Sequence, residues 1–307
     1  MGQVGSIPLI VILGPTSVGK TALSLSLAKK FKGEIVSVDS RQVYRGLDIG
    51  TGKATKRERR SIPHHLIDWK NPGKTITLSE YKKGADAAIH DIYKRGKIPF
   101  FVGGSALYIQ AVVENYLIPS VPPQPKLRKK LEAMTTHTLV KLLQKHDVLT
   151  AAKIDIANRR RIIRALEVTL ISGKPFSSLQ QKGEPLYNSL MVGLTLDRDD
   201  LYKKIDERLD ARMKRGLVSE VRQLLGSGIS ISWLSSLGLE YRYISAFLKD
   251  PQSKNKNIRK EYVSKLKYAI HDFARRQLVW FRKNRAIQWI KPTDIKLASR
   301  LVRDFLL

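Results

Sequence analysis

The chain has 307 residues, a net charge of +29 and a hydrophobic fraction of 42%. That fraction is typical of a folded protein, so the charge favours a polyanionic partner, nucleic acid first and a membrane surface second. The absence of cysteine excludes disulfides and thiolate metal sites. No stretch approaches the roughly 20 apolar residues that span a bilayer, and no signal peptide pattern begins the chain, which predicts a cytoplasmic protein.

The first predicted strand, residues 9–13, leads into Gly14-Pro-Thr-Ser-Val-Gly-Lys-Thr21 and then into a predicted helix. Strand, G-x-x-x-x-G-K-[ST] and helix in this order mark a phosphate-binding loop. Backbone N–H groups and the helix N-terminus would face a diphosphate, Lys20 would add charge, and the Thr21 hydroxyl would hold Mg2+. The residues expected to bind the diphosphate are Gly14, Pro15, Thr16, Ser17, Val18, Gly19, Lys20 and Thr21.

Asp39 ends the second predicted strand, residues 34–39, and is followed by Ser40, Arg41 and Gln42. Because the carboxyl ends of parallel strands line the ligand crevice of an α/β sheet, Asp39 is expected beside the phosphate-binding loop. Its carboxylate suits a Mg2+ ligand of the ATPase kind or a general base. Position alone leaves both roles open.

Two further segments near predicted strands carry polar residues. His64 and His65 are adjacent and point apart in an extended chain, so a structural role is favoured over metal ligation. The predicted strand at 98–103 turns into a helix through Gly103 and Gly104, with Ser105 as a cap or hydrogen-bond donor. The two glycines suggest close approach of a ligand, although a simple tight turn would look the same.

Strands alternating with helices predict a parallel α/β sheet, with further strands at 191–196 and 287–290. Between 116 and 188 no strand is predicted, and this segment opens with a proline-rich run and continues as a basic helical pattern. We therefore predict an α/β fold with a P-loop NTPase-like core, residues 1–117 and 190–307, and a helical insertion domain, residues 118–189.

Basic residues gather in two helical patterns. In the run Asn158-Arg159-Arg160-Arg161-Ile162, and at Arg164, arginines flank an apolar face of Ile163, Leu166 and Leu170. Only Glu167 lies near enough to pair with them, so phosphate contact is favoured over a solvated surface. The second pattern, residues 275–283, interleaves aromatic residues with cations and suits RNA stacking and a core-packed helix equally.

Arg208 and Arg212 lie one turn apart beside an apolar stripe in the helix predicted from residue 201. Pairing with Asp206 or Asp210 is disfavoured, because residues one or two positions apart do not face each other on a helix. An arginine in this place is suited to bind a phosphate with two hydrogen bonds.

Taken together, these segments resemble the tRNA dimethylallyltransferases, also called tRNA isopentenyltransferases. Two segments depart from the family pattern. Ser105-Ala106 stands where the family has Thr-Gly. Residues 237–241, Leu-Gly-Leu-Glu-Tyr, stand where it has Gly-Tyr-Lys-Glu, which leaves the RNA contacts of this second segment open. The resemblance covers most of the chain and runs through residues 14–21, 39–51, 63–68, 102–108, 158–168, 208, 216–221 and 275–283.

The resemblance implies a reaction in which the exocyclic N6 of the adenosine 3′ of the tRNA anticodon displaces diphosphate from dimethylallyl diphosphate, with Mg2+. Asp39 is then the general base, Thr16 lies near the bridging oxygen, and Arg208 neutralises the leaving group. The implied partners are tRNA and dimethylallyl diphosphate, without a membrane, and the protein is expected to be a monomer. The implied tRNA-binding residues are Asp39, Ser40, Arg41, Gln42, Ser105, Asn158, Arg159, Arg160, Arg161 and Ile162.

Three other functions fit parts of the sequence. A P-loop kinase or NTPase would make Asp39 a metal ligand but leaves the net charge unexplained. An isopentenyltransferase acting on free adenine nucleotide gives no reason for a basic insertion. A non-catalytic RNA-binding module explains the charge and needs neither Asp39 nor the phosphate-binding loop.

Overall fold

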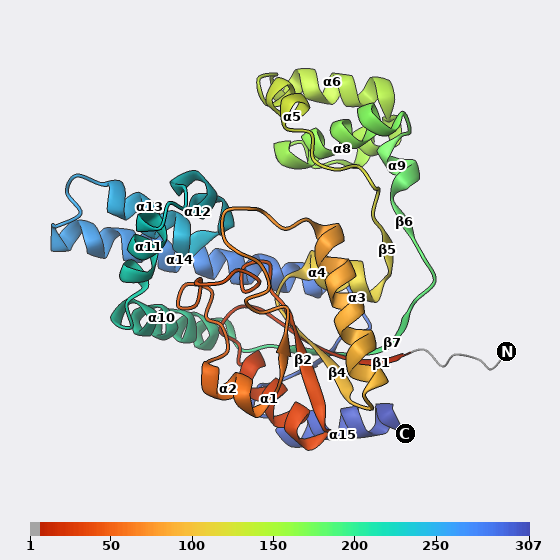
Figure 1. The fold of residues 1–307 in the computed structure, drawn as a ribbon, viewed down its shortest axis with the longest axis vertical. Coiled ribbons are helices and arrows are strands. Elements are labelled where there is room, and N and C mark those ends of the chain that lie inside the picture. Colours follow the sequence, from red (N-terminus) through yellow and green to blue (C-terminus); the bar gives the residue numbers. More distant parts are fainter. Residues whose placement is uncertain (1–6) are drawn as a thin grey trace. The chain divides into compact units, whose positions relative to one another are not determined.

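The computed structural model describes residues 7–307 and divides into two compact units. The core unit comprises the described residues up to Val113 together with Leu186–Leu307, and the insertion unit is Glu114–Pro185 (Figure 1). The insertion was expected at 118–189, whereas the compact unit begins at Glu114 and ends at Pro185. It ends earlier because Tyr187 already belongs to a core strand. Among residues 7–307, no helix has the length and apolar character that a membrane span requires.

A six-stranded sheet in which every pairing is parallel forms the centre of the core unit, as the alternation of strands and helices predicted. Its strand order is β3-β2-β4-β1-β7-β8. The central strand β1 is almost completely buried, which explains its continuous run of aliphatic residues. The strands are β1 (Ile7–Leu13), β2 (Gly33–Val38), β3 (His64–His65), β4 (Ile98–Gly103), β7 (Tyr187–Leu194) and β8 (Gln288–Ile290).

The register of the sheet brings three strand ends to one level. Leu13 at the end of β1 pairs with Gly103 at the end of β4, and Gly103 also pairs with Val38 at the end of β2. The phosphate-binding loop, Asp39 and the Gly104-Ser105 turn are the next residues of these three strands. Parallel pairing therefore places them together at the carboxyl edge of the sheet.

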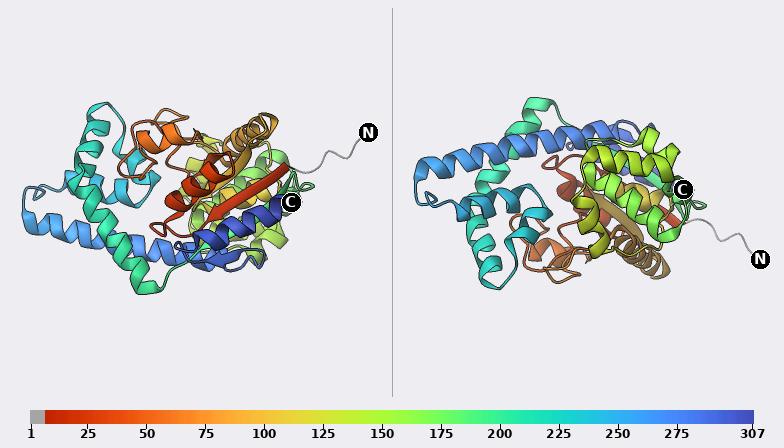
Figure 2. Two further views of the ribbon diagram at one scale, coloured as in Figure 1. Left: turned by 90° about the horizontal axis from the view of Figure 1, so that it is seen from below. Right: turned by 90° about the horizontal axis from the view of Figure 1, so that it is seen from above.

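Ten helices complete the described part of the core unit. The long helix α14 buries Leu266, Ile270, Ala274, Gln277 and Phe281 at heptad-like spacing. Helix α15 contacts α1 and β7, and both α14 and α15 can be followed in Figure 2. The helices are α1 (Lys20–Lys30), α2 (Lys56–Ser61), α3 (Leu78–Lys94), α4 (Ala106–Val113), α10 (Arg198–Lys214), α11 (Leu217–Gly226), α12 (Ile231–Leu237), α13 (Leu239–Lys249), α14 (Lys256–Phe281) and α15 (Ile295–Leu306).

The insertion unit has its own hydrophobic core, which Leu131, Leu139, Leu143, Ile162 and Leu166 dominate. It also contains the antiparallel pair β5 (Tyr116–Leu117) and β6 (Gln181–Lys182). The expectation of no strand between 116 and 188 was therefore wrong, because two-residue strands leave no periodic pattern. The helices are α5 (Pro125–Glu132), α6 (Thr136–His146), α7 (Val148–Lys153), α8 (Arg159–Ser172) and α9 (Phe176–Leu179).

Candidate active site

The phosphate-binding loop lies between β1 and α1 and has the backbone that its glycines predict. Gly14 has φ +146°, and a Cβ there would lie 2.7 Å from the Leu194 carbonyl oxygen. Lys20 donates hydrogen bonds to the carbonyl oxygens of Gly14 at 2.9 Å and Pro15 at 2.6 Å. The ammonium group is thus held at the loop, where the N-terminal end of α1 favours a bound anion.

A cavity of about 450 Å³ opens beside this loop, within the core unit. Most of the predicted site residues of the core unit line it, drawn from three strand ends and from α10. These residues are Thr16, Ser17, Val18, Gly19, Lys20, Thr21, Asp39, Ser40, Arg41, Gln42, Ser105 and Arg208. Gly14 and Pro15 form the start of the loop and are buried.

Asp39 uses one carboxylate oxygen to shape its own loop. Oδ1 accepts hydrogen bonds from the backbone N–H groups of Arg41 at 2.8 Å and Gln42 at 3.3 Å. The other oxygen, Oδ2, accepts no hydrogen bond from residues 7–307. Asp39 therefore presents one carboxylate oxygen that is available to a ligand in the cavity.

Lys20 and Arg208 share this low-dielectric site, and Arg208 weakens the charged form of Lys20. Burial lowers the pKa of Lys20 to about 7, with a further lowering by Arg208 that Asp39 opposes. Burial also lowers the pKa of Arg208 to about 10, assisted by Arg212 and opposed by Glu240 and Asp39. Two cations that repel each other in a buried place would gain from a diphosphate between them.

Arg208 and Arg212 reach the cavity from α10 and bind the backbone of one glycine-rich segment. Arg208 donates to the carbonyl oxygen of Gly52 at 3.3 Å, and Arg212 donates to that of Gly50 at 3.2 Å. Asp206 and Asp210 bind His271 and Lys267 instead, so pairing within the helix is not what holds these arginines. Arg208 thus has no carboxylate partner among the described residues.

Glu240, at the start of α13, binds two of the cations around the cavity. Its carboxylate accepts from Arg212 at 3.1 Å and lies 3.5 Å from Arg41, whose guanidinium also packs over the Phe273 ring. Arg41 therefore lies at the cavity but is already partnered within the protein. Glu240 belongs to the segment that departs from the family pattern, and no local sequence signal pointed to this role.

Glu220 on α11 fixes the backbone of the segment that follows Asp39. Its carboxylate accepts the N–H groups of Asp48 at 2.9 Å, Ile49 at 2.6 Å and Gly50 at 2.9 Å, and the Tyr241 hydroxyl at 2.9 Å. The three backbone contacts join residues 170 to 172 positions apart, so a sequence without an alignment does not reveal them. They hold Gly50 where Arg212 binds it.

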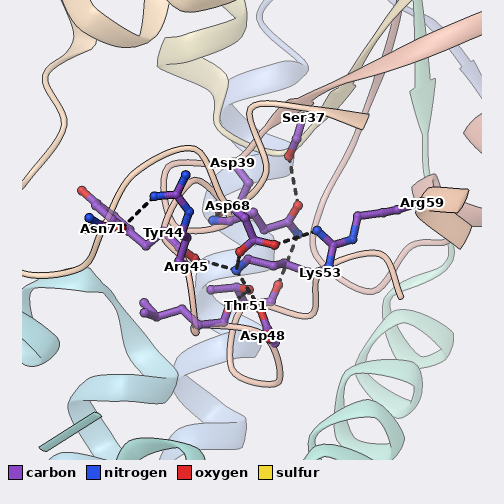
Figure 3. Close-up of polar contacts among 12 residues, drawn as sticks. Ser37, Asp39, Tyr44, Arg45, Asp48, Thr51, Lys53, Arg59, Asp68 and Asn71 are labelled. Atoms are coloured by element: carbon purple, nitrogen blue, oxygen red, sulfur yellow. Dashed lines mark hydrogen bonds and ion pairs between the residues drawn. The ribbon is translucent and has the colours of Figure 1, made fainter. Parts of the chain in front are cut away.

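The buried side chain of Lys53 also binds the segment that follows Asp39 (Figure 3). Lys53 donates to Asp68 at 2.6 Å, to Asp48 at 2.8 Å and to the Tyr44 carbonyl oxygen, and Arg59 also binds Asp68. Burial would raise the pKa of Asp68, but the hydrogen bonds from Lys53 and Arg59 outweigh it and keep that pKa low. Lys53 was not singled out from the sequence, although its side chain is almost fully buried.

Gln42, His64 and His65 each have partners within the core unit. Gln42 accepts from the Ser37 hydroxyl at 3.0 Å and donates to the Thr51 carbonyl oxygen at 3.3 Å. Nδ1 of His64 lies 2.7 Å from the Ile62 carbonyl oxygen, and Nε2 of His65 lies 2.7 Å from Glu34. The two histidines are therefore engaged in separate hydrogen bonds on β3.

The arginines of α8 in the insertion unit are less free than the sequence suggested. Arg164 binds Glu167 at 2.6 Å and the Val121 carbonyl oxygen at 3.0 Å. Arg159 binds carbonyl oxygens at the end of α5, those of Leu131, Glu132 and Met134. Both residues thus have structural partners: Arg164 pairs with the one acid that the sequence offered, and Arg159 binds carbonyl oxygens that the sequence did not indicate.

The other predicted residues at α8 differ in burial and in their partners. The side chain of Ile162 is fully buried in the insertion core, so it offers RNA no surface in this structure, and its predicted place among the tRNA-binding residues gains no support. Asn158 caps α8 by accepting from the Arg161 N–H, and Leu170 is 38% exposed rather than on the buried face. Arg160 and Arg161 are exposed, and their side chains bind no other described residue.

The chain is similar to proteins of one family. A family model described as IPP transferase matches residues 42–284. A protein of Thermomicrobium roseum named tRNA dimethylallyltransferase is 42% identical over 291 residues, which cover 94% of this chain and 87% of that protein. A Roseiflexus protein of the same name is 46% identical over 281 residues, covering 90% of each chain.

Solved structures give the same result. The tRNA isopentenylpyrophosphate transferase of Bacillus halodurans superposes with a TM-score of 0.71 at 36% identity, covering 97% of this chain and 96% of that one. A eukaryotic dimethylallyltransferase acting on tRNA superposes with a TM-score of 0.79 at 27% identity, covering 95% of this chain and 75% of that one.

Proposed function

This chain belongs to the tRNA dimethylallyltransferase family and is an enzyme of that activity, and on this premise we propose how its residues perform the transfer. The donor is dimethylallyl diphosphate, and the acceptor is the exocyclic N6 of the adenosine 3′ of the tRNA anticodon. One observation carries the proposal: Lys20, Asp39 and Arg208 line a single cavity beside the phosphate-binding loop.

The amine is the weak partner in this reaction, because its lone pair is delocalised into the adenine ring. N6 attacks C1 of the dimethylallyl group, the C1–O bond breaks, and diphosphate leaves with the bonding electrons. Asp39 takes the proton from N6 through Oδ2, while Oδ1 stays bound to the Arg41 and Gln42 N–H groups. General-base catalysis of this kind contributes about 10²–10⁴-fold to the rate.

Positive groups stabilise the charge that develops on the diphosphate. Lys20 and the N–H groups of the loop bind it in the ground state, and Arg208 approaches it from α10 as it leaves. Thr16 lies on the loop at the cavity and is suited to meet the bridging oxygen.

The residues of the loop also suit Mg2+. Thr21, at the first turn of α1, is exposed and lines the cavity. Residues 7–307 contain no group of three or more His, Asp or Glu side chains that would hold a metal by themselves. This donor set fits an ion that takes most of its ligands from the substrate diphosphate and water, and such an ion would neutralise phosphate charge.

The acceptor must leave the anticodon stack to reach the cavity, which requires a pocket for the flipped base and contacts to the RNA backbone. We assign the pocket to Ser40, Gln42 and Ser105, with Arg41 at its wall. We assign backbone contacts in the insertion unit to Arg160 and Arg161, with Arg159 and Asn158 shaping the start of α8. All these groups belong to one chain, and we propose that it acts as a monomer.

Incubation with labelled dimethylallyl diphosphate and, in parallel, tRNA or AMP tests this function, with labelled ATP as a separate donor. Transfer of the dimethylallyl label to tRNA and not to AMP is expected. Transfer to AMP would indicate an isopentenyltransferase of free nucleotides. Phosphate release from ATP without prenyl transfer would indicate a kinase or NTPase, and RNA binding without either reaction would indicate a non-catalytic module.

A further inference from the structure

Helix α14 places one polar side chain in its buried stripe. Leu266, Ile270, Ala274 and Phe281 are the apolar members, and Gln277 is only 8% exposed among them. A buried amide is costly unless both its oxygen and its nitrogen form hydrogen bonds. The partners of Gln277 therefore show why this helix needs a glutamine at this place.

The two ends of the Gln277 amide bind two loops of the active site. Oε1 accepts the backbone N–H of Thr16 at 3.0 Å, and Nε2 donates to the carbonyl oxygen of Gly104 at 2.8 Å. A Cβ at residue 104 would lie 2.6 Å from Nε2, so the second glycine of the turn is needed for this contact.

The turn that Gln277 binds is also tied to β2. The N–H groups of Gly104 and Ser105 both donate to the Val38 carbonyl oxygen at 3.3 Å, one residue before Asp39. Gln277 thus closes a chain of contacts from Thr16 in the phosphate-binding loop to the strand end that carries the general base. Lys20 and Thr21, at the start of α1, are not part of that chain.

We propose that Gln277 is a positioning residue for prenyl transfer, which sets the spacing between the donor side of the site at Thr16 and the acceptor side at Ser105 and Asp39. This inference rests on the proposed function. A small displacement of reacting groups costs rate, whereas the diphosphate contacts of Lys20 and Thr21 remain. Loss of Gln277 should therefore lower kcat much more than it raises the KM for the donor.

Gln277→Met keeps the length and burial of the side chain and removes both hydrogen bonds. We expect kcat for transfer to tRNA to fall about tenfold or more, with the donor KM changed less than about threefold. Gly104→Ala should also lower kcat, because its Cβ displaces Nε2 without any change at residue 277. That Cβ would lie 3.2 Å from the Gly14 carbonyl oxygen as well, which binds Lys20, so the donor KM is compared in Gln277→Met alone. Gln223→Met, at an exposed glutamine of α11, is the matched control and should leave both constants unchanged.

Gln277→Glu provides a rescue that depends on pH. A protonated glutamic acid can accept from Thr16 and donate to Gly104, whereas the carboxylate opposes the Gly104 carbonyl oxygen. The kcat of Gln277→Glu relative to wild type should rise as the pH falls from 8 to 6. The same ratio for Gln277→Met should stay constant over this range.

Amide hydrogen exchange tests the contacts without any turnover. Exchange in peptides covering 14–19 and 103–106 should be faster in Gln277→Met and Gly104→Ala, and unchanged in Gln223→Met. Unchanged exchange, or faster exchange with unchanged kcat, would overturn the positioning role. A wild-type protein that transfers nothing to tRNA would instead overturn the proposed function, and the exchange data would still decide whether Gln277 joins the two loops.

Discussion

The phosphate-binding loop and the arginine cluster of α8 were both predicted to bind phosphate, but their basic side chains have different surroundings in the structure. In the loop, the backbone geometry forms the site and Lys20 is held by two carbonyl oxygens. On α8, Arg159 and Arg164 bind carbonyl oxygens and Glu167 of their own unit. The comparison teaches that a spaced pattern with glycines predicts local backbone geometry more reliably than a run of charge predicts free cations.

The reason lies in the partners available to each group. Glu167 is fully buried and binds Arg128 as well as Arg164. Burial alone would raise its pKa, but these arginines and the Gln124 N–H bring it to about 2. One buried acid thus occupies two cations of the insertion unit, whereas Arg208 in the core has no such acid. Cations without a buried acid are the better candidates for ligand contacts.

The largest expected effect that tests the core site is that of Asp39→Asn. The amide oxygen can still accept the Arg41 and Gln42 N–H groups, so the loop and donor binding should persist, while an amide in place of Oδ2 cannot take a proton. The single-turnover rate should fall about 10²-fold or more. Loss of Mg2+-dependent donor binding with a nearly normal rate would identify Asp39 as a metal ligand instead.

Lys20→Ala and Arg208→Ala separate the two cations of the site. Removal of one group that stabilises developing charge costs about 10²-fold in kcat. Lys20→Ala should also weaken binding of the donor, because the ammonium contacts the ground-state diphosphate. Arg208→Ala should leave donor binding closer to normal. Measurement of donor Kd and single-turnover rate for both variants decides this, and an unaltered rate in Arg208→Ala would return Arg208 to a structural role.

How far the sequence predicted the site depended on the range of the contacts. The loop, Asp39 and the Gly104-Ser105 turn each follow a strand directly, so the order of strands in a parallel sheet was enough to bring them together. Glu220, Glu240 and Gln277 lie on helices and contact Asp48, Arg41 and Thr16, which are 172, 199 and 261 positions away in the chain. Nothing in their neighbourhood distinguishes them from surface residues, and only the fold reveals that they are buried.

In the insertion unit, the sequence predicted the helices but not how they pack. Its helical character was evident from composition, but two-residue strands and the pairing of Arg159 with the end of α5 depend on packing that no local pattern records. Ile162 is among the tRNA-binding residues that the resemblance implies, but it follows the exposed Arg161 and is fully buried. One position along a helix turns a side chain by about 100°, which is enough to move it from the surface to the core.

Arg160 and Arg161 are exposed, whereas Arg159 and Arg164 have partners within the unit, and this difference predicts smaller effects that separate the two pairs. Arg160→Gln with Arg161→Gln should raise the tRNA KM several-fold and reduce the salt dependence of RNA binding by a slope of about 1–2, because fewer counterions are released. Arg159→Gln with Arg164→Gln should instead lower the melting temperature. Binding assays across a salt series, together with thermal melts, measure both. Equal behaviour of the two double variants would show that the structural distinction is irrelevant to RNA binding.

The smallest expected effect is the uptake of a proton by Lys20 when a diphosphate binds. Its pKa of about 7 in the free protein means that Lys20 is largely neutral at pH 8 and largely charged at pH 6. A bound diphosphate favours the charged form, so binding should take up nearly one proton at pH 8 and much less at pH 6, and affinity should fall as the pH rises through 7.

Calorimetry with inorganic pyrophosphate in two buffers of different ionisation enthalpy measures this uptake, and Lys20→Met corrects for the protons of the ligand. Because Arg208 lowers the pKa of Lys20, Arg208→Met should reduce the uptake at pH 8. An uptake that is the same in wild type and Lys20→Met would mean that Lys20 stays charged in the free site, and its repulsion by Arg208 would then have no part in donor binding.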